Sequence, residues 1–455
     1  MVITAKATAP KNQSLTSHQL KKRIKLSENN YQNNIDSDYT EKIEDLDKNF
    51  KYNSNSNHYW SDPEFSTLYG TPLYEAASPS QKIALNHLSW VSQYNHIAHS
   101  EAETIHYNLI AAGSFSAMGG DYETIAHQLD HESSQERSHI HAFYKVSYQT
   151  IKALLGKQAF INPPKNELYQ DSWSSLQLSL STYNDYALRF LAKMMLKGKE
   201  QYHSQYLKQL ESENKLISTS TNGFFHGRGV IPQSLLRFFA VNWGSSPFLA
   251  SQYFTLRFMA NLLLKNAEHS IFLYCKKLQK QGEFVPVPTA ISHYHFLDEA
   301  FHTTTSQFLA RDLYKFFTKP TAYEKFVVNM AVYMSQRSNF KGISGVLINR
   351  PFADDRSLMG YIFKLLQSPL FDMSAQEALY WMEKCLCHEH EGFHLSAKSH
   401  QRLLSNLRRF CAHLDYLWPI NREMRLMASG GTISKAIQSN VDTFNQFSKT
   451  VAYNN

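Results

Sequence analysis

The chain has 455 residues, of which 43% are hydrophobic and 13% aromatic, enough to fill one large core with appended segments. Its formal net charge of +7 is spread along the chain, so we expect no nucleic-acid partner. Four cysteines without a paired framework and an N-terminus without an apolar signal segment indicate a cytoplasmic protein. Gly244 and Pro247 interrupt the longest uncharged stretch, Phe238 to Leu256, and we expect no membrane insertion.

The first 60 residues differ in composition from the rest of the chain. They are rich in Asn, Ser, Lys and Asp and contain few apolar positions. Such a segment buries too little surface to offset the loss of chain entropy. Residues 1–60 are therefore predicted to form a polar, flexible extension.

Apolar residues at helical spacing follow from about residue 78, and few stretches alternate with a period of two, so the fold class is predicted to be all-α. The first two helices should form an antiparallel hairpin, because Gly119 and Gly120 lie between them. The expected helices are Ser80–Ser116, Tyr122–Leu155, Leu176–Glu213, Phe248–Gln281, Ala290–Phe317, and C-terminal helices near 374–417 and 432–448. We expect residues 61–318 to form the main bundle, with an insertion at about 157–245, and residues 319–455 to form a C-terminal helical region packed on it.

Two segments carry Glu-x-x-His within a helical pattern: Glu136 with His139, and Glu299 with His302. Residues three apart on a helix project from the same face, so each carboxylate and imidazole can reach one ion. Ferritin-like diiron proteins build their site from two such helices and one glutamate from each of two others. The motifs therefore predict a metal centre inside a ferritin-like four-helix bundle.

A glutamate on the preceding helix comes before each motif. Glu101 lies 35 positions before Glu136, and Glu268 lies 31 positions before Glu299. Glu103 competes with Glu101, but Glu101 lies closer to the apolar stripe of its helix and is preferred. Glu268 lies in a strongly apolar helix, where a buried carboxylate needs a charged partner or a metal.

The predicted ligands are carboxylates and imidazoles without thiolates, which favours two iron ions, with manganese in one or both sites as the alternative. A second ligand-rich segment, Cys385 to His394, lacks the spacing of a zinc finger. We interpret it as a partly exposed helix end.

The sequence resembles the p-aminobenzoate N-oxygenase family, the aureothin-type diiron oxygenases. The resemblance comes from the run Asp298-Glu299-Ala300-Phe301-His302, from His295 four positions before the glutamate, and from the lead-in Pro72–Gln81 that precedes Glu101. It implies that His295 is a seventh protein ligand. The implied ligands are Glu101, Glu136, His139, Glu268, His295, Glu299 and His302. Gln135 departs from the family pattern, which has a carboxylate that hydrogen-bonds a ligand histidine at this place.

The resemblance implies a non-haem diiron oxygenase that uses dioxygen and an external electron donor to oxidise a small organic substrate, with N-oxygenation of an amine as the specific reaction. One alternative is a ferritin-like ferroxidase or iron-handling protein without an organic substrate. Another is a helical scaffold without catalysis. A homodimer is compatible with the sequence.

Overall fold

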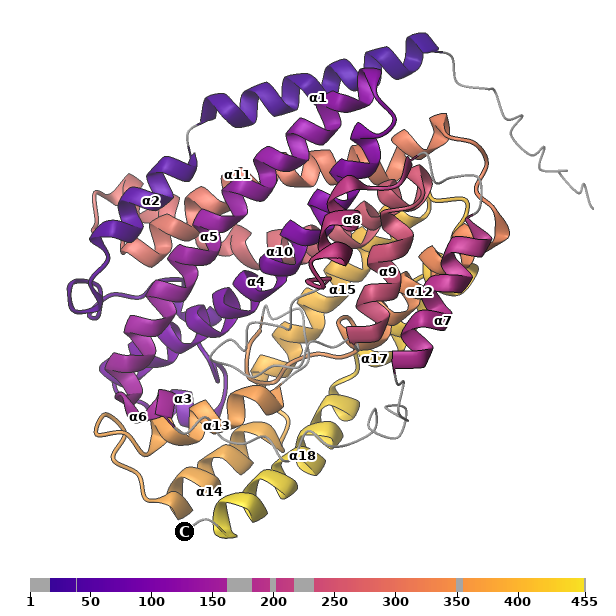
Figure 1. The fold of residues 1–455 in the computed structure, drawn as a ribbon. Helices are drawn as coiled ribbons and strands as arrows, with labels where there is room; N and C mark the ends of the chain where they lie inside the picture. The colour runs from indigo at the N-terminus through magenta and orange to yellow at the C-terminus, as the bar shows by residue number, and fades with distance from the viewer. Residues whose placement is uncertain are drawn as a thin grey trace, which may run out of the picture.

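The computed structural model describes residues 17–37, 39–161, 182–196, 202–216, 233–348 and 355–453, and each regular element in these ranges is a helix. The predicted all-α fold class is confirmed. Four long helices form a bundle, and further helices cover its sides and one end (Figure 1). No helix among the described residues combines the length and the apolar character needed to span a membrane.

Two helical hairpins make up the bundle. Helix α4 (Pro79–Ser116) pairs with α5 (Glu123–Leu155), and α10 (Pro247–Gln281) pairs with α11 (Val287–Arg311). Helix α4 also contacts α10, and α5 contacts α11, which joins the hairpins into one four-helix unit. The four helices predicted to carry the ligands are therefore neighbours in the structure.

Local signals explain where these helices begin and end. The Ser78 hydroxyl accepts from the backbone N–H of Gln81, whose side chain accepts from the N–H of Ser78, so a capping box starts α4. Ser246 caps α10 by accepting from the N–H of Leu249. Gly282, with a φ of 67°, ends α10 in the left-handed conformation that favours glycine.

The N-terminal segment contains two helices, α1 (Ser17–Ser37) and α2 (Tyr39–Asn49), which contact both α5 and α11 (Figure 1). Ile24 and Ile43 are buried against the rest of the protein. The structure thus differs from the expected flexible extension over residues 17–37 and 39–60, while residues 1–16 and residue 38 lie outside the described ranges. A count of apolar residues misses this packing because much of it is polar.

The helix expected at 176–213 is divided in the structure. Its described parts are α7 (Thr182–Met195) and α8 (Gln205–Ser212); residues 176–181 and 197–201 are not among those described. Ser204 starts α8 by accepting from the N–H of Leu207, and its own N–H donates to the carbonyl of Gly244. A helix running through 204 would lose these contacts.

The remaining helices surround the bundle. Helices α12 and α15 pack against α10, α13 contacts α5, and α14 pairs with α18. Their bounds, with those of the other short helices, are α3 (Pro72–Ala76), α6 (Gln158–Ile161), α9 (Gln233–Trp243), α12 (Ala322–Ser338), α13 (Asp355–Leu366), α14 (Ala375–Leu386), α15 (Glu391–Cys411), α16 (Pro419–Arg422), α17 (Arg425–Gly430) and α18 (Ile433–Tyr453).

Candidate metal centre

All four bundle helices contribute buried acidic or histidine side chains to the middle of the bundle. The glutamates and histidines are Glu101 of α4, Glu136 and His139 of α5, Glu268 of α10, and His295, Glu299 and His302 of α11. Each is at most 6% exposed. Those on α5 and α11 are three or four residues apart and therefore share one face of their helix.

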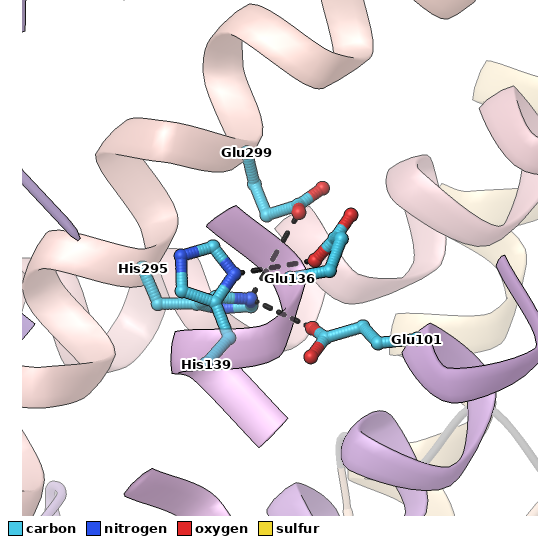
Figure 2. Close-up of side chains that lie close together, drawn as sticks. All are labelled: Glu101, Glu136, His139, His295 and Glu299. Carbon is cyan, nitrogen blue, oxygen red and sulfur yellow. Dashed lines mark hydrogen bonds and ion pairs between the residues drawn. The ribbon is translucent and has the colours of Figure 1, made fainter. Parts of the chain in front are cut away.

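Five of these side chains converge on one point. Glu101, Glu136, His139, His295 and Glu299 each place one carboxylate oxygen or ring nitrogen so that these atoms all lie within 4.8 Å of one another. Figure 2 shows the two imidazoles and the three carboxylates directed towards this common centre. Buried groups of these types, brought together from three helices, form a candidate site for metal ions.

The other two predicted ligands contact this cluster directly. Nδ1 of His302 lies 2.7 Å from Oε1 of Glu299 and 3.3 Å from Oε1 of Glu136. Oε1 of Glu268 lies 2.7 Å from Nδ1 of His295. The structure thus brings all seven predicted ligand residues together around one centre.

The competing glutamate lies outside the cluster. Oε1 of Glu101 is 2.9 Å from Nε2 of His295, inside the bundle. Oε1 of Glu103 is 3.9 Å from Nε2 of His99, and its side chain is 36% exposed. The structure thus places Glu101, and not Glu103, beside His295; the assignment of Glu101 as a ligand stays a prediction.

The two Glu-x-x-His histidines have different outer partners. Nε2 of His139 lies 3.1 Å from Oδ2 of Asp298, whereas Nε2 of His302 lies 3.0 Å from Oε1 of Gln135. Such outer partners orient a ligand imidazole and tune its basicity. A carboxylate therefore supports one histidine and a neutral amide supports the other, at the position where the sequence departs from the expected pattern.

Two buried charged residues next to the cluster were not predicted. They are Arg257 of α10 and Glu132 of α5. Nη1 of Arg257 lies 2.5 Å from Oε2 of Glu132, and Nη2 of Arg257 lies 3.3 Å from Oε1 of Glu136. The sequence did contain a signal, because Arg257 is the charged residue that ends a long uncharged stretch and lies eleven positions, or three helical turns, before Glu268. Arg257 offsets part of the negative charge gathered on α5.

The crowding of charge shifts the pKa values of the cluster. Burial, followed by the nearby carboxylate of Glu136, raises the pKa of Glu101 to about 7. Burial alone would lower the pKa of His139, but hydrogen bonds to Asp298 and Glu136 raise it to about 9. Protons therefore balance part of the charge in the metal-free protein, and divalent cations would displace them.

The cluster has the properties expected of a site for divalent metal ions. Oε2 of Glu101, Oε2 of Glu268 and Oδ1 of Asp298 are buried and have no hydrogen-bond partner among the described residues. A buried carboxylate oxygen without a partner is costly unless a cation satisfies it. Carboxylates and imidazoles without a thiolate suit iron or manganese. The residues present therefore fit a centre that binds iron or manganese.

A cavity of about 90 Å³ lies between α4 and α10 and reaches the cluster. Its polar lining includes the candidate ligands Glu101, Glu136 and Glu299, together with Arg257. The exposed Ala260 marks an opening to the surface. The remaining lining residues on α10 are mostly apolar, whereas those on α4 are mostly polar. They are Asn261, Leu263, Leu264 and Ala267 on α10, and Gln93, His96, Ile97, Ser100 and Thr104 on α4.

The segment from Cys385 to His394 does not converge on a common point. Cys385 is buried, and its carbonyl oxygen lies 2.8 Å from Nε2 of His390. His394 pairs with Glu389 at 2.9 Å, with both side chains more than half exposed. This arrangement agrees with the interpretation as a helix end.

A family model described as "Acyl halogenase CylC-like" matches residues 22–448. No curated protein and no solved structure matches the chain. The match shows that the assignment to the p-aminobenzoate N-oxygenase family was wrong. That assignment was based on ligand motifs. These motifs describe a metal centre but do not separate families that share that type of centre. The broader prediction agrees with the match: an iron-dependent oxidative enzyme that acts on an organic substrate.

Proposed function

Because the chain belongs to the CylC-like acyl halogenase family, we propose that it is a diiron enzyme that halogenates an aliphatic carbon of an acyl substrate. One observation carries the proposal: the cavity between α4 and α10 joins an apolar lining to the carboxylates of the cluster. A substrate chain in this cavity would lie next to the metal ions.

Seven residues would hold the two iron ions, with manganese as the alternative metal: Glu101, Glu136, His139, Glu268, His295, Glu299 and His302. When bound, the ions supply the reductive activation of dioxygen that attack on an unactivated C–H bond requires. Asp298 and Gln135 orient two of the ligand histidines, and Arg257 holds Glu136.

The lining of the cavity suits an alkyl chain. Ile97, Leu263, Leu264 and Ala267 offer aliphatic contacts, and each buried methylene group of a substrate gains about 0.8 kcal/mol from leaving water. Such contacts hold an alkyl chain in the cavity but do not distinguish one methylene group from the next. The depth to which the chain inserts therefore decides which carbon lies at the metal centre. A ferroxidase would need no alkyl-lined cavity, which favours the organic substrate.

The proposed reaction balances with dioxygen as oxidant and an external two-electron donor. One C–H bond is replaced by a carbon–halogen bond; a halide ion, one dioxygen molecule, three protons and two electrons are consumed, and two water molecules form. If a hydroxyl group from water or dioxygen is added to the carbon in place of the halide, the product is an alcohol. N-oxygenation of an amine was implied only by the resemblance to the p-aminobenzoate N-oxygenase family, which the family match overturns.

The test uses the full-length protein loaded anaerobically with ferrous iron. It is given an acyl thioester series of increasing chain length, bromide or chloride, a chemical reductant and then dioxygen, and products are analysed by mass spectrometry. We expect a product in which one hydrogen is replaced by the supplied halogen, and none with a Glu136→Gln variant. A product hydroxylated without halogen, or no acyl product with any chain, would contradict the proposal.

A further inference from the structure

Helix α1 places buried polar side chains against the bundle beside the metal centre. Asn34 is 1% exposed, although it comes from a segment whose composition predicts a solvated tail. Its partner is Gln135 of α5, 101 positions later in the chain and 4% exposed. A fully buried contact between two polar side chains persists only if their hydrogen bonds are satisfied.

The two amides satisfy each other. Nδ2 of Asn34 donates to Oε1 of Gln135 at 2.9 Å, and Nε2 of Gln135 donates to Oδ1 of Asn34 at 2.9 Å. This reciprocal pair holds the plane of the Gln135 amide. Oε1 of Gln135 also lies 3.0 Å from Nε2 of His302.

The orientation of this amide determines what His302 can do. When Oε1 accepts the Nε2 proton of a neutral imidazole, Nδ1 is left with a free lone pair. Nδ1 is the atom that faces Glu299 and Glu136 in the cluster. A carboxylate, like that of Asp298 beside His139, can accept a hydrogen bond through either oxygen. An amide has one acceptor oxygen and one N–H donor group, so Gln135 needs a partner that keeps its oxygen directed at His302.

We propose that Asn34 is a positioning residue for the metal centre: through Gln135 it orients His302 so that Nδ1 faces Glu299 and Glu136, where it would bind a metal ion. This makes α1 a functional part of the site. The inference rests on the diiron centre proposed above. It assigns a role to a residue outside the four ligand helices, and it explains why an amide can stand at position 135.

A matched control lies one turn away on the same helix. Asn30 donates through Nδ2 to the carbonyl of Phe301 and to Oγ1 of Thr305, at 3.2 Å in each case. It therefore anchors α1 to α11. It contacts neither a predicted metal ligand nor a residue that orients such a ligand. Asn34→Ala and Asn30→Ala both remove an asparagine that anchors α1, but only the first frees the amide of Gln135.

The experiment is an anaerobic titration of the metal-free full-length protein with Co²⁺, followed by calorimetry and by the visible absorption of the bound ion. In Asn34→Ala the amide of Gln135 is no longer fixed, so His302 loses its oriented outer partner. Losing such a partner weakens metal binding about tenfold or more, so we expect weakening of this size for one of two Co²⁺ ions, with a changed spectrum. Asn30→Ala should bind both ions as the wild type does. Asn34→Asp keeps an oxygen that accepts from Nε2 of Gln135, so Oε1 of Gln135 still faces His302, and the variant should bind both ions even if its melting temperature falls.

The outcomes separate the two proposals. Wild-type affinity and spectrum in Asn34→Ala, or equal weakening in Asn30→Ala, would overturn the role of Asn34 while leaving the diiron centre intact. A wild-type protein that binds no Co²⁺ would overturn the diiron centre and this inference with it.

Discussion

Nδ1 of His295 lies 2.7 Å from Oε1 of Glu268, which joins α11 to α10 at the centre of the bundle. The phenol of Tyr94 donates to the same glutamate oxygen, also at 2.7 Å. The other ring nitrogen of His295 faces Glu101 of α4. One histidine outside the two Glu-x-x-His motifs thus contacts carboxylates from two further helices. Among the predicted ligands only α11 carries such a histidine, so the two halves of the metal site are unequal.

Replacing His295 should weaken one metal ion more than the other. The His295→Ala variant leaves Glu101 and Glu268 without their shared partner, so we expect at least about a tenfold loss of affinity for one ferrous ion, the scale of effects seen even for outer partners of ligands. His293→Ala is the control, because His293 is buried, stacks on Phe272 and makes no contact with the cluster. Anaerobic titration with ferrous iron measures both. Equal affinities in His295→Ala and the wild type would remove His295 from the ligand set.

Arg257 should matter for stability as well as for the site. In Arg257→Met the buried Glu132 loses its ion-pair partner, which typically costs about 3–5 kcal/mol of unfolding free energy. Adding Glu132→Gln removes the stranded charge and should recover much of that loss. Urea unfolding of the metal-free variants tests this, and a double variant no more stable than Arg257→Met would show that the ion pair is not the cause.

The opening of the cavity can be narrowed without disturbing the core. Ala260 lines the cavity and is exposed, so Ala260→Phe should fold normally and hinder entry of an acyl chain. We expect a several-fold rise in KM for the longest accepted acyl chain, with Ala260→Ser close to wild type and metal content unchanged in both. Unchanged KM across the chain-length series in Ala260→Phe would mean that the substrate enters elsewhere.

A histidine away from the metal centre should make stability fall in acid. Burial lowers the pKa of His87 to about 4, and the neutral ring accepts from the Tyr52 hydroxyl and donates to the carbonyl of His58. The unfolded chain takes up this proton near pH 6.5, so the contribution of His87 is present above that pH and is lost as pH falls towards 4. The loss amounts to about 3 kcal/mol at about 1.4 kcal/mol per pH unit.

The measurement for His87 is urea unfolding of the metal-free protein at pH 7.5 and at pH 4.5, compared with His87→Gln. The variant should be less stable at pH 7.5 but should lose less stability on acidification than the wild type. Identical pH dependence in the two proteins would show that another group is responsible.

The helices and ligand motifs could be predicted because their signals are local. The spacing of Glu136 and His139, and of Glu299 and His302, sets which side chains share a helical face. The capping and turn residues that bound α4 and α10 are likewise adjacent to them. Where the signal was local, the predicted helices and the observed ones agree closely.

The parts that could not be predicted depend on contacts between distant segments. Asn34 and Gln135 are 101 positions apart, and Arg257 and Glu132 are 125 apart, so no window of sequence contains either pair. Helix α1 packs partly through amides and hydroxyls, which makes its composition resemble that of a solvated tail. The family could not be separated from others with a similar ligand set, because the motifs specify the metal site and not the substrate cavity.

The most direct test of the diiron centre is Mössbauer spectroscopy of the full-length protein reconstituted anaerobically with ⁵⁷Fe²⁺ and then exposed to dioxygen, with the iron content measured on the same sample. We expect about two iron ions per chain, as one pair of nearby carboxylate-bridged sites, and after dioxygen a diamagnetic diferric spectrum from magnetic coupling between them. One iron per chain with the paramagnetic spectrum of an isolated ferric ion, or no bound iron, would contradict it.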